Sequence, residues 1–146
     1  MATLEQLKSK FKSIDFGKLI EDSVVATKGD LIEYQRGQML HGLNSSGSTI
    51  GKYRSKDYAR RKANMNPVAG YGNVDLKLTG EFQRNLNVRF FARSFFLFST
   101  DSKMKKLTEK YGDVIWGLSP SYTLEYSNLY IADQMNARIK KFINGL

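Results

Sequence analysis

The chain contains no cysteine. Disulfide bonds, thiolate chemistry and cysteine-ligated zinc are therefore excluded. Proline is scarce as well, with two among 146 residues, and no low-complexity tract interrupts the sequence. Because typical domains have ~100–150 residues, we expect residues 1–146 to form a single domain.

Long apolar runs are also missing. No stretch approaches the ~20 apolar residues that a membrane-spanning helix needs. The N-terminal segment MATLEQLKSKFKSID lacks the apolar run of a signal peptide. We therefore expect a protein that is made and kept in the cytosol and has no membrane partner.

Patterns that carry catalysis are absent. The chain has one histidine, His41, and no phosphate-binding pattern of the GxxxxGK[ST] or GxGxxG type. A lone histidine forms neither a catalytic triad nor an ordinary zinc site. A hydrolase or other enzyme is the weaker alternative; a pocket with two close carboxylates would support it, and no spacing in the sequence predicts one. We expect no catalytic residue, no cofactor and no bound metal, and hence no enzyme.

Acidic residues are rare in one part of a basic chain. The net charge is +9, yet residues 34–74 carry Asp57 as their single acid beside seven basic residues. Two glycine-rich stretches flank a short helix there, so we expect residues 42–74 to form an extended basic arm. Such charge suits a polyanion or an acidic protein surface. The expected contact residues are Lys52, Arg54, Lys56, Arg60, Arg61 and Lys62.

Two tyrosines in the basic arm leave the kind of partner open. Tyr53 and Tyr58 interleave with the basic side chains. Base stacking together with phosphate neutralisation would use that mixture, which favours nucleic acid. A solvated basic helix that meets an acidic neighbouring subunit is the alternative, and we favour the protein partner.

The periodicity predicts an α+β fold. Apolar residues at helical spacing predict a helix over residues 4–14 and a long one over 16–40, with a break near Lys28-Gly29. A helix capped by Ser55 ends before Pro67. Alternation over residues 85–99 predicts a β-hairpin with its hinge at residues 92–94. Thr100 or Asp101 caps a helix that ends at Gly112, and Ser119-Pro120 opens a C-terminal helix that packs on the hairpin or a small antiparallel sheet.

The hairpin is unusually rich in phenylalanine. Its pairs Phe90-Phe91 and Phe95-Phe96 place aromatic rings on both faces of the strands. Each ring buries ~150–250 Å² in a core, and several exposed rings favour aggregation. A helix of the same chain or a neighbouring subunit must therefore cover the second face. We expect hydrophobic subunit contacts at Phe90, Phe91, Phe95 and Trp116.

Several short motifs follow one another along the chain. A glycine-rich loop leads into a Tyr/Lys-rich segment in QMLHGLNSSGSTIGKYRSKDYARRK. A turn, Leu78-Thr79-Gly80-Glu81-Phe82, then precedes the hairpin. The last motifs are Lys110-Tyr111-Gly112 and Ile115-Trp116-Gly117-Leu118-Ser119 before the final helix. Over residues 35–140 this arrangement resembles the tail-completion or head–tail joining proteins of tailed bacteriophages, a family related to the Mu-type virion morphogenesis proteins.

The resemblance implies a structural protein of the virion that is assembled in the host cytoplasm. Copies of the chain would form a ring around the DNA channel and join portal, adaptor or tail proteins, close to the DNA. Residues Leu78, Thr79 and Gly80 would form the turn that begins the hairpin region. The phenylalanine-rich hairpin and the long helical N-terminal third depart from the family pattern.

Overall fold

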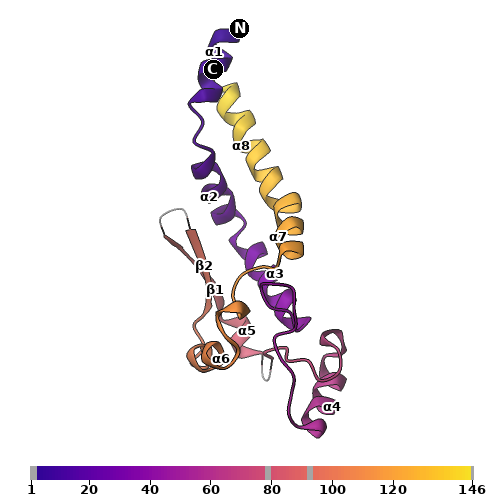
Figure 1. Ribbon diagram of the computed structural model, residues 1–146. Coiled ribbons are helices and arrows are strands. Elements are labelled where there is room, and N and C mark those ends of the chain that lie inside the picture. The colour runs from indigo at the N-terminus through magenta and orange to yellow at the C-terminus, as the bar shows by residue number, and fades with distance from the viewer. Residues whose placement is uncertain (1–2, 78–79, 92–93, 146) are drawn as a thin grey trace.

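The computed structural model describes residues 3–77, 80–91 and 94–145. The chain has the predicted α+β fold, in which helices surround one antiparallel hairpin. The molecule is elongated. The N-terminal helix and the end of the C-terminal helix lie together at one extremity of the molecule. The helix of the basic arm lies at the other extremity (Figure 1).

Three helices form the N-terminal third. They are α1 (Leu4–Lys12), α2 (Phe16–Ala26) and α3 (Lys28–Leu40). The hydroxyl of Thr3 and the side chain of Gln6 form a capping box that starts α1, and the Asp15 carboxylate accepts from Lys18 N–H at the start of α2. The predicted break near Lys28-Gly29 is confirmed, because the helix is interrupted at Thr27.

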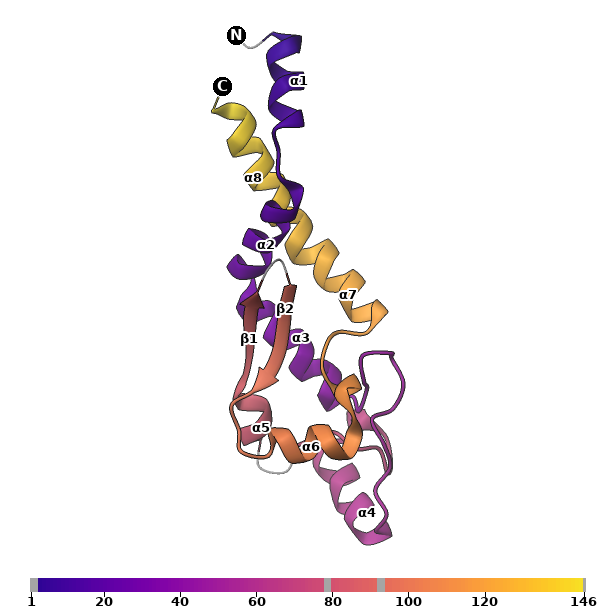
Figure 2. The same cartoon turned by 60° about the vertical axis from the view of Figure 1, so that its left-hand side comes forward.

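The basic arm, residues 42–74, folds against its own chain. Isolated β-bridges pair Leu43 with Thr49 and Lys52 with Asn73. Helix α4 (Lys56–Met65) begins at the predicted Ser55 cap, and a 3-10 turn, η1 (Pro67–Ala69), follows it. Figure 2 shows α4 projecting at the end of the molecule away from the termini.

The predicted hairpin is confirmed. A short helix, α5 (Glu81–Arg84), leads into β1 (Leu86–Phe91), which pairs antiparallel with β2 (Ser94–Ser99). Of the expected hinge, Ser94 opens β2, while residues 92–93 lie outside the described residues. Leu78 and Thr79 of the expected turn also lie outside them. Gly80 precedes α5 with φ 87°, a left-handed conformation that glycine adopts without strain.

The last third is helical. Helix α6 (Met104–Tyr111) is followed by a 3-10 turn, η2 (Asp113–Ile115), and by α7 (Pro120–Tyr126), a π-helical stretch η3 (Ser127–Ile131) and α8 (Ala132–Asn144). The start of α7 at Ser119-Pro120 is confirmed. The predicted cap of α6 is wrong: Lys103 is the N-cap, and the Asp101 carboxylate instead accepts from Lys103 N–H at 2.8 Å.

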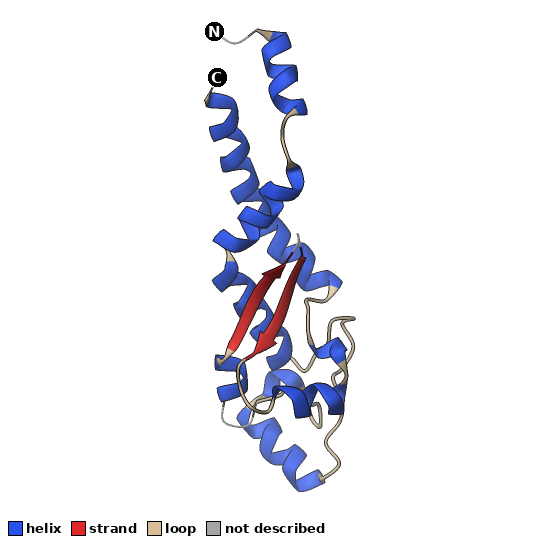
Figure 3. Cartoon of the chain, turned by 90° about the vertical axis from the view of Figure 1, so that its left-hand side faces the viewer, coloured by secondary structure: helices blue, strands red, loops and turns tan. Residues whose placement is uncertain are grey.

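Two clusters of buried residues hold these elements together. One joins α3, the arm and α5 through Met39, Val74, Phe82 and Ile115. The other joins the hairpin to α2, α3 and α7 and includes Leu31 and Val88. The C-terminal helix therefore packs against the hairpin as predicted, because Tyr126 of α7 shares a cluster with Val88 and Leu97. Figure 3 shows the hairpin lying along the helices.

Candidate functional site

The hairpin has one covered face and one open face. Val88 and its cross-strand partner Leu97 point into the core and are buried. On the opposite face Phe91 is 73% exposed and Phe96 is 57% exposed. Within the described residues no helix of this chain covers those two rings, so cover by a neighbouring subunit stays the prediction for this face. We call Arg89, Phe91, Phe96 and Phe98 the outer hairpin face.

A shallow apolar groove runs along the outer hairpin face. Its volume is about 540 Å³, and Met104 of α6 completes its lining. The Arg89 guanidinium lies 5.3 Å from the centre of the Phe98 ring, a cation–π contact that holds this side chain over the aromatic surface. Exposed aromatic rings beside an arginine are the residue types enriched at the centres of protein interfaces.

The structure separates the four predicted hydrophobic contact residues. Phe91 is open and Phe95 is 43% exposed at the hairpin tip. Phe90 is half-buried against the second cluster, 6.5 Å from the Phe95 ring. Trp116 is half-buried and packs against both core clusters, so its place at a subunit interface stays a prediction. Its indole N–H donates to the Thr108 hydroxyl at 3.0 Å, which satisfies the polar group of a core residue.

The basic arm presents five of its six predicted contact residues to solvent. These exposed residues are Lys52, Arg54, Lys56, Arg60 and Arg61. The two interleaved tyrosines are engaged within the arm, where the Tyr53 and Tyr58 rings meet edge to face at 4.9 Å. The Tyr53 hydroxyl donates to Asp75 at 3.2 Å. The arm therefore presents charged side chains to solvent, while Tyr53 and Tyr58 pack within it.

Lys62, the sixth predicted contact residue, is buried, so its prediction as a contact residue is wrong. It is 5% exposed, and its ammonium lies 2.8 Å from Asp75 Oδ1, which is itself nearly inaccessible. The Lys62 ammonium also donates to the Lys77 carbonyl. A charge held in this way contacts neither nucleic acid nor a partner. Its position on the inner side of α4 puts it with Ala59, the other buried residue of that helix.

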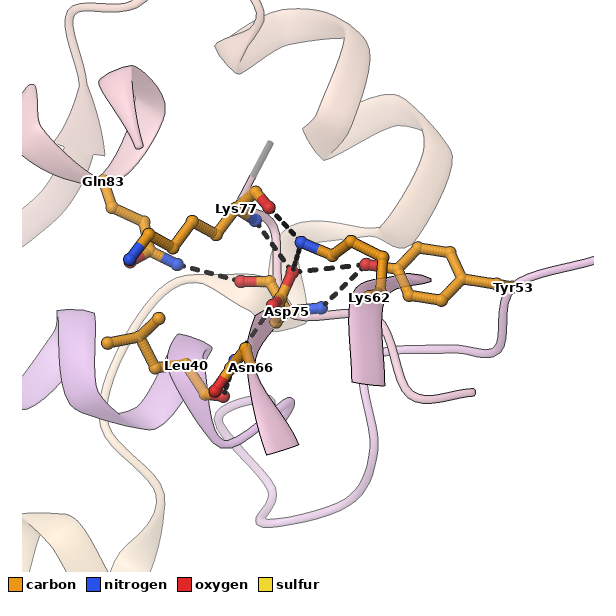
Figure 4. Close-up of polar contacts among 7 residues, drawn as sticks. All are labelled: Leu40, Tyr53, Lys62, Asn66, Asp75, Lys77 and Gln83. Atoms are coloured by element: carbon orange, nitrogen blue, oxygen red, sulfur yellow. Dashed lines mark hydrogen bonds and ion pairs between the residues drawn. The ribbon is translucent and has the colours of Figure 1, made fainter. Parts of the chain in front are cut away.

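Asp75 is the centre of a buried polar cluster that ties the arm to the body (Figure 4). Beside Lys62, its carboxylate accepts from the Asn66 amide at 2.9 Å and from Lys77 N–H at 3.0 Å. Asn66 also donates to the Leu40 carbonyl at the end of α3. The cluster therefore connects α3, α4 and the chain leading to α5.

The pKa values in this cluster follow from its contacts. Burial alone would raise the pKa of Asp75, but the hydrogen bonds from Lys62, Asn66 and Lys77 and the Lys62 charge outweigh it and hold the pKa below its usual value. Burial raises the pKa of Tyr53. A carboxylate that stays ionised and fully engaged is suited to holding structure, since proton transfer at neutral pH needs a pKa near 7.

Next to this cluster Leu76 has φ 56°, which is unusual for a residue other than glycine. Its side chain is buried and lines a cavity of about 200 Å³ together with Tyr53, Tyr58 and Tyr111. Backbone strain of this kind costs about 1–3 kcal/mol and persists where the surroundings impose it. Here the Asp75 contacts on one side and the packing of Leu76 on the other impose it.

Two buried glutamines of α3 were missed by the sequence analysis. Gln35 donates to the Ile115 carbonyl and accepts from Gly117 N–H, at 3.2 and 2.8 Å. Gln38 donates to the Gly117 carbonyl and accepts from Ser119 N–H, at 2.8 and 2.7 Å. The two amides thus satisfy the backbone of the segment that carries Trp116. Helical spacing marks them as inward-facing, but polar residues on such a face give no signal of their partners.

The helices at the two chain ends contain no buried residue, and all residues of α1 and of α8 lie in the described part of the chain. Leu4 and Phe11 of α1 and Phe142 of α8 are instead exposed, and the Lys10 ammonium lies 4.5 Å from the Phe142 ring centre. A second apolar surface therefore lies at this extremity, separate from the outer hairpin face.

Comparison of this chain with family models, with curated proteins and with solved structures gives no match.

The resemblance to tail-completion proteins consequently stays a prediction, and the geometry must support any function by itself. Within the described ranges no three His, Cys, Asp or Glu side chains are grouped so as to hold a metal ion. Every helix there is also too short or too polar to cross a bilayer. His41 ends α3, and its Nδ1 lies 2.8 Å from the Gly37 carbonyl oxygen.

Proposed function

We propose that this chain is a structural subunit of a tailed-phage virion, a connector or tail-completion protein that joins head to tail. Copies of it surround the DNA channel as a ring and contact portal, adaptor or tail proteins. The outer hairpin face is the observation that carries the proposal. A monomer with two neighbouring phenylalanines this exposed is prone to aggregate, whereas a subunit covers them on assembly.

The basic arm supplies the second contact of the proposed subunit. Three of its exposed side chains, Lys56, Arg60 and Arg61, are held on α4, whose position the Lys62–Asp75 pair fixes. Charges on a rigid element steer an acidic partner into one orientation and raise the rate of association. The arm and the outer hairpin face thus give the subunit two different surfaces for two different neighbours.

Electron microscopy of the purified chain, and of particles that contain it, tests the proposal. We expect closed rings with a central opening, in which each copy presents the same face to the next. A head-to-tail interface closes into a ring when its rotation closes. Finding single chains of 16.6 kDa in both preparations would contradict the connector function.

Nucleic-acid binding is the second candidate, and the five exposed basic residues of the arm favour it. The two functions differ in their response to salt. Several phosphate contacts would reduce DNA affinity on the order of a thousandfold or more between ~50 and ~200 mM salt, and Arg60→Ala with Arg61→Ala would abolish binding. The connector function predicts weak binding with a nearly flat response, because few phosphate contacts would then form.

A further inference from the structure

An apolar groove lies between α2, the hairpin tip and the C-terminal helix. Its volume is about 420 Å³, and it is lined by apolar side chains that include Ile20, Val24, Phe95, Tyr126, Ile131 and Met135. Helices α2 and α8 lie side by side in Figures 1 and 2. Phe90, Ser94 and Phe95 of the hairpin face α2 across an adjoining cavity. The groove is large enough to admit side chains of the size of Leu and Phe.

Helix α1 has the complementary surface. Leu4, Leu7 and Phe11 recur at a spacing of three and four, which places them on one face of the helix. An isolated helix shorter than ~12–15 residues is marginal in water, so nine residues need a packing surface to stay helical. Within the described chain α1 has little packing surface, since Leu4 is 67% exposed and no residue of the helix is buried.

The dimensions of helix and groove agree. Nine residues at 1.5 Å each make α1 roughly 13 Å long. The groove wall from Thr123 to Met135, on the uninterrupted helical run of α7, η3 and α8, spans roughly 18 Å by the same rise. An amphipathic helix laid in an apolar groove with anchors at i, i+3 and i+7 is a recurrent mode of recognition.

The charges of the two surfaces also agree. Helix α1 carries three lysines and one glutamate. The stretch from Asp15 to Glu33, which supplies α2 and one wall of the groove, carries five acids and two lysines. Glu21 lies at the groove edge, where it lines an adjoining cavity with Ile20 and Phe95. A lysine-bearing helix is therefore attracted to this rim.

The structure points α1 away from its own groove. Ser13 to Asp15 connect α1 to α2, and Asp15 is fixed there as the cap of α2. Figures 1 and 2 show α1 extending past the end of α8, beyond the body of the molecule. A chain that carries both a helix and the groove complementary to it, at different places, associates head to tail with its own copies.

We propose that α1 of one copy occupies the groove between α2, the hairpin tip and the C-terminal helix of a second copy. This inference rests on the self-assembly that the proposed function requires and names the elements that perform it. The contact is heterologous, so each copy donates one helix and receives another. The outer hairpin face stays free in this arrangement for a different neighbour.

Thiol crosslinking between full-length chains tests the exchange, because the absence of cysteine removes background reaction. One chain carries Lys8→Cys, beside the apolar face of α1. The other carries Ser127→Cys, within the groove lining. Mixed with a bismaleimide about as long as a helix diameter, ~10 Å, they are expected to give a covalent dimer as the main product. The matched control is Asn128→Cys, exposed on the next residue of the same helix, and it should give at least tenfold less.

A second variant keeps the test independent of folding. Leu7→Glu with Phe11→Glu, added to the Lys8→Cys chain, should remove the crosslink and leave the unfolding transition of the body nearly unchanged, because no residue of α1 is buried in its own chain. Equal crosslinking at residues 127 and 128, or a crosslink that survives the two glutamates, overturns the proposal.

The outcomes also separate this inference from the proposed function. Rings in the microscope without the Lys8–Ser127 crosslink would overturn the helix exchange and leave the connector function standing. The crosslink in chains that form no ring would support the exchange and contradict the connector function. A crosslink confined to single chains that carry both cysteines would show α1 folding back on its own groove and would overturn the exchange.

Discussion

Replacing Asp75 with alanine is expected to lower the free energy of unfolding by about 3–5 kcal/mol, measured by urea denaturation at pH 7. The substitution leaves the Lys62 ammonium buried without its counter-charge and removes the acceptor of the Asn66 and Lys77 donors. A buried charge that loses its partner costs far more than the same loss at the surface. The arm should detach from the body at lower denaturant concentration than the helices unfold.

The surface pair between Arg60 and Asp57 is the matched control. Its atoms lie 3.9 Å apart and both side chains are exposed, so Asp57→Ala should change the free energy of unfolding by less than about 1 kcal/mol. A second control replaces both buried partners, Lys62→Met with Asp75→Leu, which should recover most of the lost stability. Equal effects of Asp75→Ala and Asp57→Ala would show that the buried pair is not what holds the arm.

Acid should reproduce the loss in the unchanged chain. Because folding lowers the pKa of Asp75, its stabilising contribution is complete above its unfolded pKa, about 3.9, and is lost as pH falls below that value through the lower folded pKa. The Asp75→Ala variant lacks this component, so its stability should vary less with pH in that range than the stability of the unchanged chain.

The second large effect is expected for Gln38→Leu, which should cost about 2–6 kcal/mol of folding free energy. The leucine leaves the Gly117 carbonyl and Ser119 N–H without their partners, and each unsatisfied buried group costs about 1–3 kcal/mol. Thermal unfolding followed by tryptophan fluorescence is a suitable measurement, because the single tryptophan, Trp116, lies in the segment that Gln38 holds.

Gln134→Leu in α8 is the control for that substitution. Gln134 is partly exposed and lies far from the Trp116 segment in sequence, so the change should stay within about 0.5 kcal/mol. If Gln38→Leu is as mild as Gln134→Leu, water replaces the lost amide and the glutamine does not fix the segment.

The elements of the fold could be predicted from local signals. Ser55 and Ser119-Pro120 begin their helices where a cap and a proline at the first turn direct, and the alternation in β1 and β2 gives the hairpin its two faces. These signals lie within a few residues of what they determine. The prediction of the α6 cap was wrong because the Asp101 carboxylate accepts from Lys103 N–H, two residues ahead. Local propensity does not distinguish this turn from a helix cap.

The candidate site was predicted only in part, for a physical reason. Lys62 reads as one more member of a basic run, and its burial depends on Asp75, thirteen residues away, meeting it on the inner side of α4. The packing of Trp116 likewise depends on its ring contact with Phe82 and its hydrogen bond to Thr108, which belong to other elements. By contrast, exposure of the outer hairpin face follows from the aromatic pairs, since two adjacent phenylalanines cannot both face one core.

The most direct measurement of the central claim is photo-crosslinking from position 96 in the cells or particles that contain the protein. With a photoreactive phenylalanine analogue in place of Phe96, the account predicts covalent adducts to a second copy or to another protein. The same analogue at Ser48, exposed in the loop before the arm helix, should give few. A chain that stays at 16.6 kDa after irradiation at position 96 would mean that nothing covers the outer hairpin face, which would contradict the account.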